Sequence, residues 1–120
     1  MRDFRNLKVW EKAHRLALTV YVATKDFPKE ERFGLTSQVR RSVVSIASNI
    51  AEGCGRGGER ELARFLDIAA GSAAEFEYQV LLARELHFLD KKTYDQIAAD
   101  IREVKQMLAS LIRKLRSQPR

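Results

Sequence analysis

The scarcity of helix-breaking residues constrains this chain more than any other feature. Its 120 residues contain only two prolines, Pro28 and Pro119, and four of its six glycines lie within residues 53–58. Proline and clustered glycine are the strongest local signals for turns, so the chain is divided into a few long, uninterrupted segments. No segment sustains the alternation of apolar and polar residues that is typical of exposed strands. The sequence therefore predicts an all-α fold.

Apolar side chains recur at intervals of three and four residues in four segments, which is the spacing of one helix face. Asp90 stands where an N-cap is expected, and Gly53 is expected to follow a helix end. A chain of this length has room for one core, so residues 1–120 are expected to form a single domain. The short turns predict an antiparallel up-down-up-down four-helix bundle. Its predicted helices span about residues 7–26, 33–52, 59–88 and 91–116.

The first predicted helix has more apolar surface than one bundle face needs. Its apolar sector covers roughly 260° of the helical wheel, whereas a single packed face needs about 100°. Two interpretations follow: the helix packs on two sides within the monomer, or it forms a subunit interface, which we favour because large exposed apolar surfaces mark contact sites. The candidate interface residues are Val9, Leu16, Leu18 and Val22.

The stretch GCGRGG places Gly53, Gly55 and Gly58 at the spacing of a dinucleotide-binding loop. That loop needs a strand before it and further parallel strands to form a crevice, and the residues before Gly53 have helical spacing. The stretch is therefore interpreted as a flexible turn. A weaker alternative is an anion site, in which backbone amides of the turn act together with Arg56 and Arg60.

The net charge of +6 favours anionic partners, and its distribution is uneven. Residues 1–58 carry 11 basic and 6 acidic side chains, residues 59–90 carry 3 and 7, and residues 91–120 carry 8 and 3. This alternation suits contacts between copies of the chain as well as RNA binding. The candidate nucleic-acid or anion contacts are Arg40, Arg41, Arg56, Arg60, Arg113, Lys114 and Arg116.

Catalytic, metal and cofactor sites find little support in the sequence. Glu11 and His14 have the E-x-x-H spacing of di-iron bundles, but His87 lacks the matching glutamate that a second motif requires. Glu77 is expected to form a structural ion pair with Arg84. We therefore expect no catalytic residues, no metal and no cofactor.

The sequence also bears on the cellular compartment. Cys54 is the only cysteine, so no internal disulfide can form, which suits a reducing cytosol. The N-terminus lacks the apolar run of a signal peptide, and no stretch approaches the ~20 apolar residues of a membrane span. We expect a soluble cytoplasmic protein without a membrane partner.

Four motifs follow one another along the chain: FPKEE (27–31), FGLTSQVRR (33–41), SNIAEG (48–53) and AAGS (69–72). In this order they resemble a known family. The chain is similar to the four helix bundle proteins called 23S rRNA-intervening sequence proteins, found in bacteria, from about Leu7 to Leu89, with the last helix matching only in pattern. Two departures are Phe76, where leucine is common, and GRGGER, which replaces a serine-rich start of the third helix.

The resemblance implies a four-helix bundle that assembles as a cyclic homopentamer in the cytosol and has no known enzymatic activity. The family is also similar in shape to accessory proteins of diversity-generating retroelements, which are pentamers that bind nucleic acid and a reverse transcriptase through a basic surface. We therefore expect a non-enzymatic oligomer with a binding or scaffold role, linked to RNA or to an RNA-associated protein. The alternatives are a direct nucleic-acid-binding accessory protein and, second, a small helical enzyme.

Overall fold

The computed structural model describes residues 2–117, which form four α-helices and three short 3-10 turns, with no β-strand in that range. The all-α prediction is confirmed for this part of the chain. Residues 1 and 118–120, which complete the predicted domain, lie outside it. The helices are α1 (Lys8–Ala23), α2 (Leu35–Gly55), α3 (Glu59–Glu85) and α4 (Lys91–Arg116), and the 3-10 turns are η1 (Phe4–Asn6), η2 (Thr24–Asp26) and η3 (Lys29–Glu31).

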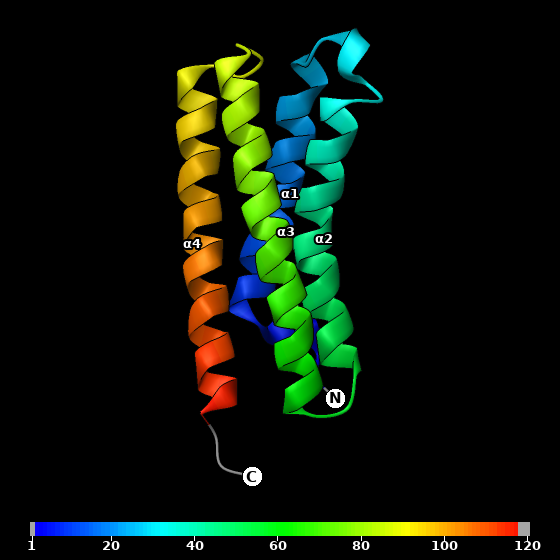
Figure 1. The fold of residues 1–120 in the computed structure, drawn as a ribbon, viewed down its shortest axis with the longest axis vertical. Helices are drawn as coiled ribbons and strands as arrows, with labels where there is room; N and C mark the ends of the chain where they lie inside the picture. Colours follow the sequence, from blue (N-terminus) through cyan, green and yellow to red (C-terminus); the bar gives the residue numbers. More distant parts are fainter. Residues whose placement is uncertain (1, 118–120) are drawn as a thin grey trace.

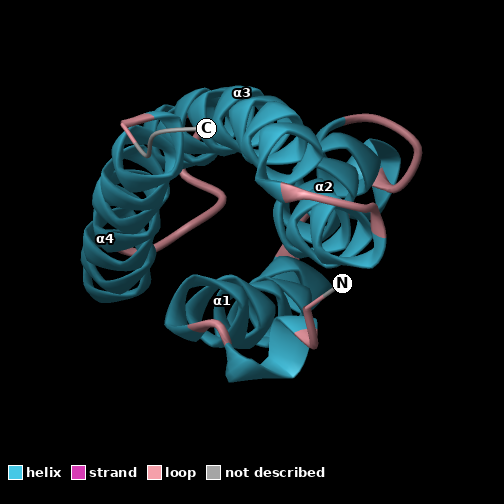
Figure 2. Cartoon of the chain, turned by 90° about the horizontal axis from the view of Figure 1, so that it is seen from below, coloured by secondary structure: helices cyan, strands magenta, loops and turns pink. Residues whose placement is uncertain are grey.

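The helices lie side by side along the long axis of a body that measures 50 × 22 × 20 Å (Figure 1). In Figure 1 the colours run up along α1, down along α2, up along α3 and down along α4. Each helix packs against the next one in the chain, and α1 also packs against α4. Seen along the axis, α1 and α3 therefore occupy opposite corners of the bundle (Figure 2).

The apolar positions that the periodicity singled out fill the space between the helices. They are buried in one cluster to which all four helices contribute, because an apolar side chain on a helix is stabilised only when a neighbour covers it. α3 contributes small residues as well as large ones, which lets its neighbours approach closely. The largest fully buried side chains include Leu16, Ile46, Ile50, Leu66, Phe76, Ile101 and Leu108.

Gly53 has a packing role that differs from the predicted one. It lies inside α2, which continues to Gly55, and is not the residue that follows the helix end. A Cβ atom at Gly53 would lie 2.8 Å from the Cβ of Phe65 and 3.1 Å from Leu62 Cδ1. Glycine is therefore needed here because α3 crosses close to the backbone of α2.

The helix ends also differ in detail from the sequence prediction. α1 stops at Ala23 because the next residues tighten into η2, and α3 stops at Glu85, two residues before His87 adopts a left-handed φ of 66°. The N-cap prediction for Asp90 is confirmed, since its carboxylate accepts a hydrogen bond from the backbone N–H of Thr93 at 2.7 Å.

Candidate nucleic-acid interface

The structure separates the seven predicted basic contacts into two groups. Arg40 and Arg41 lie in the first half of α2, whereas the other five lie where the α2–α3 turn and the end of α4 meet (Figure 1). Arg116 of α4 forms an ion pair with Asp67 of α3, which joins these two elements. The backbone N–H of Arg2 donates to Cys54 O at 3.0 Å, so the N-terminal segment lies here too. We call this region, formed by η1, the α2–α3 turn and the last turn of α4, the basic end.

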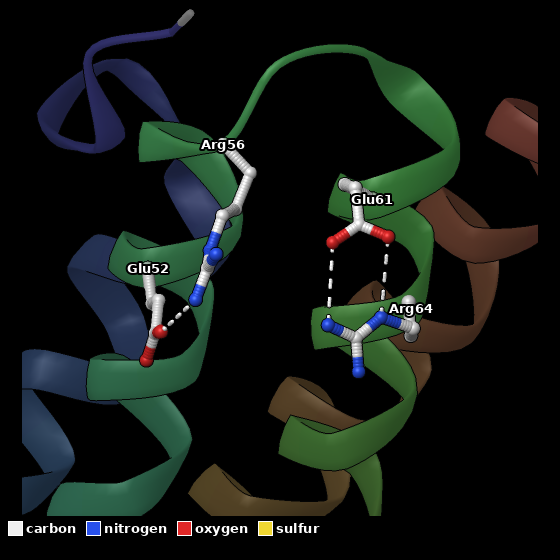
Figure 3. A network of polar contacts seen from close by, with 4 residues as sticks. All are labelled: Glu52, Arg56, Glu61 and Arg64. Carbon is white, nitrogen blue, oxygen red and sulfur yellow. Dashed lines mark hydrogen bonds and ion pairs between the residues drawn. The ribbon is translucent and has the colours of Figure 1, made fainter.

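Ion pairs satisfy the carboxylates that lie among these cations. Figure 3 shows two of them on either side of the α2–α3 turn, Glu52 with Arg56 and Glu61 with Arg64. The hydrogen bond from Arg64 lowers the pKa of Glu61, so this carboxylate is charged at neutral pH. The pairs at the basic end are Arg2–Glu59 (2.8 Å), Arg5–Asp3 (3.3 Å), Arg56–Glu52 (2.8 Å), Arg64–Glu61 (3.2 Å) and Arg116–Asp67.

Three of the predicted basic residues take no part in these ion pairs. Arg60, Arg113 and Lys114 are exposed, and within residues 2–117 their side chains have no hydrogen-bond or ion-pair partner. The C-terminal end of α4 carries a partial negative charge, which favours basic side chains at that position. The basic end therefore presents positive charge that neighbouring carboxylates do not neutralise, and such charge attracts phosphates.

Arg40 is used by the fold. Its Nε–H donates to Thr24 Oγ1 at 2.8 Å, its Nη2 donates to the carbonyl oxygen of Tyr21 at 3.2 Å, and its guanidinium lies 4.6 Å from the centre of the Tyr21 ring. These contacts tie α2 to the last turn of α1, where helix carbonyls lack intrahelical partners. Arg40 therefore has a structural role, and its contact with nucleic acid stays a prediction. Arg41 is exposed and has no such contact in the described part of the chain.

The predicted interface residues of α1 fall on two different sides of the helix. Val9 and Leu16 are 4% and 1% exposed, because they pack into the core of their own chain. Leu18 and Val22 are 57% and 65% exposed. Val9 and Leu16 are thus corrected from interface to core, since a helical wheel shows that α1 is apolar on both sides but not which side faces inward. The periodicity also missed three exposed apolar residues of α3, which are Ile68, Tyr78 and Leu81.

The residues that were considered as metal ligands or catalytic groups contact other side chains of the fold. His14 stacks on Trp10 at 4.9 Å, and Glu11 pairs with Arg15. Glu77 accepts a hydrogen bond from Lys105 of α4 at 2.6 Å, which corrects the predicted pair with Arg84. The described residues contain no group of three or more histidine, cysteine, aspartate or glutamate side chains that is placed to hold a metal ion.

Only residues 56–58 of the glycine-rich stretch form the predicted turn, because α2 includes Gly53, Cys54 and Gly55. The helix α2 precedes it, and Gly58, with a φ of 90°, is the N-cap residue of α3. Cys54 is buried beside the turn, and this burial raises the pKa of its thiol. Within residues 2–117 no helix is both long enough and apolar enough to cross a membrane.

Comparisons with known proteins agree with this architecture. The profile of a family described as 23S rRNA-intervening sequence protein matches residues 5–110. The chain is also similar to the crystal structure of a protein with unknown function from the S23 ribosomal protein family of Bacteroides thetaiotaomicron, with 27% sequence identity and a TM-score of 0.80. That similarity covers 88% of this chain and 95% of the other. No curated protein matches the sequence.

Proposed function

This chain belongs to the 23S rRNA-intervening sequence protein family, and we propose that it is a non-enzymatic, oligomeric binding protein of the cytoplasm whose partner is RNA. The proposed unit is an up-down-up-down bundle that assembles into a closed ring, for which the resemblance implies five copies. The observation that carries the RNA contact is the set of three exposed cations at the basic end, Arg60, Arg113 and Lys114.

The basic end suits a phosphate backbone for two reasons. Its three cations are not neutralised by neighbouring carboxylates within the described residues, so ion pairs need not break before phosphates bind. The cations also come from two helices that the Arg116–Asp67 pair holds together, which makes the surface pre-organised. In an oligomer this surface repeats, so one RNA molecule contacts several copies and gains avidity.

The experiment compares two triple charge reversals that change the net charge equally. The first replaces the basic-end cations (Arg60→Glu, Arg113→Glu, Lys114→Glu). The matched control replaces three exposed lysines at the opposite end of the bundle (Lys25→Glu, Lys29→Glu, Lys92→Glu). Affinity for a structured RNA is measured by fluorescence anisotropy over a series of salt concentrations.

We expect the wild-type affinity to fall linearly with salt on logarithmic axes, because phosphate binding releases counterions. The basic-end variant should lose at least about tenfold in affinity and have a shallower salt slope, whereas the control should change by less than about threefold. Equal losses in both variants would mean that overall charge alone attracts RNA. Absence of RNA binding by the wild type would contradict the proposed function.

A further inference from the structure

We infer that two separate apolar faces of the bundle bind each other in neighbouring copies of this chain. The first, which we call the groove face, consists of Leu18, Tyr21, Phe33 and Val44, which line a groove between α1 and α2, together with the exposed Val22, one helical turn after Leu18 on α1. The second, which we call the α3 face, consists of Ile68, Tyr78 and Leu81 of α3 and of Leu86, which directly follows α3. Within residues 2–117 these two faces account for all the large apolar side chains that are exposed.

The groove face is a continuous depression between α1 and α2. One part of it is lined by apolar and aromatic residues around Trp10, Leu18 and Ala47, and the adjoining part contains Phe33, which is 88% exposed. Tyr21 and Val44 line both parts and join them. Exposed aromatic residues next to apolar ones are typical of the centres of protein interfaces.

The positions of the two faces favour a head-to-tail contact. α1 and α3 occupy opposite corners of the bundle, so the groove face and the α3 face point in different directions (Figure 2). A subunit with two different complementary faces forms heterologous contacts, which close into a ring or extend into a filament. A two-fold dimer would cover one face and leave the other exposed.

Charge determines which faces can meet. The arginine-rich part of the groove face is lined by Arg32, Arg40 and Arg41 and by no carboxylate, so two groove faces repel each other. From Ile68 to Leu86 the chain carries Glu75, Glu77 and Glu85 against a single basic residue, Arg84. Glu77 is paired with Lys105 of α4, so Glu75 and Glu85 carry the negative charge of this face. Pairing two α3 faces would place carboxylates together, whereas pairing a groove face with an α3 face places them beside arginines. This complementarity identifies a second copy of the chain as the occupant.

This inference rests on the oligomeric part of the proposed function, and it adds which surfaces meet. The groove-face variant carries Leu18→Glu and Val22→Glu, and the α3-face variant carries Tyr78→Glu and Leu81→Glu. A matched control carries Ala99→Glu and Ala109→Glu at positions of α4 outside both faces. Masses are measured by size-exclusion chromatography with multi-angle light scattering, and helicity is measured by circular dichroism.

We expect the wild type and the control to be multimers of equal mass, and each face variant to be a helical monomer. An equimolar mixture of the two face variants should form a dimer with one copy of each, because the intact α3 face of one variant binds the intact groove face of the other. Growth stops at two copies because the remaining faces are disabled.

Four results would overturn the inference. A face variant that remains multimeric excludes its face from the contact, and a mixture that remains monomeric shows that the two faces do not pair. A groove-face variant that stays multimeric but loses RNA affinity assigns that face to RNA. A monomeric wild type refutes the oligomeric part of the proposed function together with this inference, whereas the RNA contact at the basic end is tested separately by the charge reversals.

Discussion

The helices α1 and α4 lie side by side in the bundle and differ in how many of their faces are apolar. α4 has a strict repeat of three and four residues, and its periodic positions from Ile97 to Leu108 are buried, so its outward surface is polar. α1 buries Val9, Leu16 and Val20 on one side and exposes Leu18 and Val22 on another. The apolar stripe that matches the helix period is buried within the monomer, whereas the apolar residues outside that stripe remain exposed.

The same two helices also end differently. The last turn of α4 carries its own basic residues, Arg113, Lys114 and Arg116, beside the negative end of the helix dipole. The last turn of α1 has none, and Arg40 of α2 provides the positive charge there. At the end of α4, Arg113 and Lys114 have no ion-pair partner within the described residues, whereas Arg40 at the end of α1 is held by contacts of the fold.

The largest expected effect compares the two sides of α1 directly. Leu16→Ala should lower the free energy of unfolding by about 2–5 kcal/mol, because it leaves a cavity in the core. Leu18→Ala should change the unfolding free energy of the monomer by less than about 0.5 kcal/mol, because it removes an exposed side chain. Urea denaturation at low protein concentration measures both. Equal effects would show that both sides of α1 are packed within the monomer.

The next effect compares the adjacent arginines of α2. Arg40→Ala should cost about 1–3 kcal/mol, because the carbonyl of Tyr21 and the hydroxyl of Thr24 lose a charged donor. Arg41→Ala should cost less than about 0.5 kcal/mol. Arg40→Lys should recover only part of the loss, since one ammonium group does not reproduce the two-point contact of a guanidinium. Denaturation midpoints measure all three, and an equal loss at Arg41 would refute the structural role of Arg40.

These pairs of neighbours show what the sequence can and cannot predict. The helical segments were predictable because burial selects apolar residues at the helix period, and Asp90 was predictable because capping is local. The wheel of α1 did not distinguish Leu16 from Leu18, because the side that faces inward depends on where α2 and α4 lie. Glycine is needed at position 53 because α3 passes close to the backbone of α2. A local sequence pattern does not contain the distance between two helices, so this packing role could not be predicted.

The candidate site was predictable only in part, for the same reason. Basic residues near helix ends can be found in a sequence, and Arg60, Arg113 and Lys114 are exposed in the structure. Whether an arginine is already paired depends on the register between helices. Arg40 reaches the end of α1, and Lys105 of α4 takes the partner that was assigned to Arg84.

A smaller effect compares the N-terminal ends of α4 and α1. Asp90 caps α4, whereas Leu7 at the start of α1 provides no side-chain cap. The hydrogen bond from the backbone N–H of Thr93 lowers the pKa of Asp90 below its ordinary value. The ionised cap therefore stabilises the fold above the unfolded pKa of about 4, and this contribution is lost as the pH falls through the lower, folded pKa.

Two substitutions separate the charge of this cap from its hydrogen bond. Asp90→Asn retains an acceptor but does not titrate, so its thermal midpoint should lie slightly below that of the wild type at neutral pH and approach it in acid. Asp90→Ala should be less stable than Asp90→Asn at every pH, because it has no acceptor for the N–H of Thr93. Thermal midpoints between about pH 3 and pH 7 measure these differences. A gap between the wild type and Asp90→Asn that stays constant over this range would contradict the role of the charge.

The smallest expected effect concerns the ion pair that joins α1 to α4. Lys12 of α1 contacts Glu103 of α4, whose hydrogen bond raises the pKa of Lys12, and Asp100 lies 3.9 Å from the same ammonium. A double-mutant cycle with Lys12→Ala and Glu103→Ala should give a coupling of about 0.2–1 kcal/mol at low salt, because solvent reaches both side chains. The coupling should shrink further at about 1 M salt, where the screening length is only ~3 Å. A larger, salt-independent coupling would mean that these charges, like the core of α1, help to position the two helices.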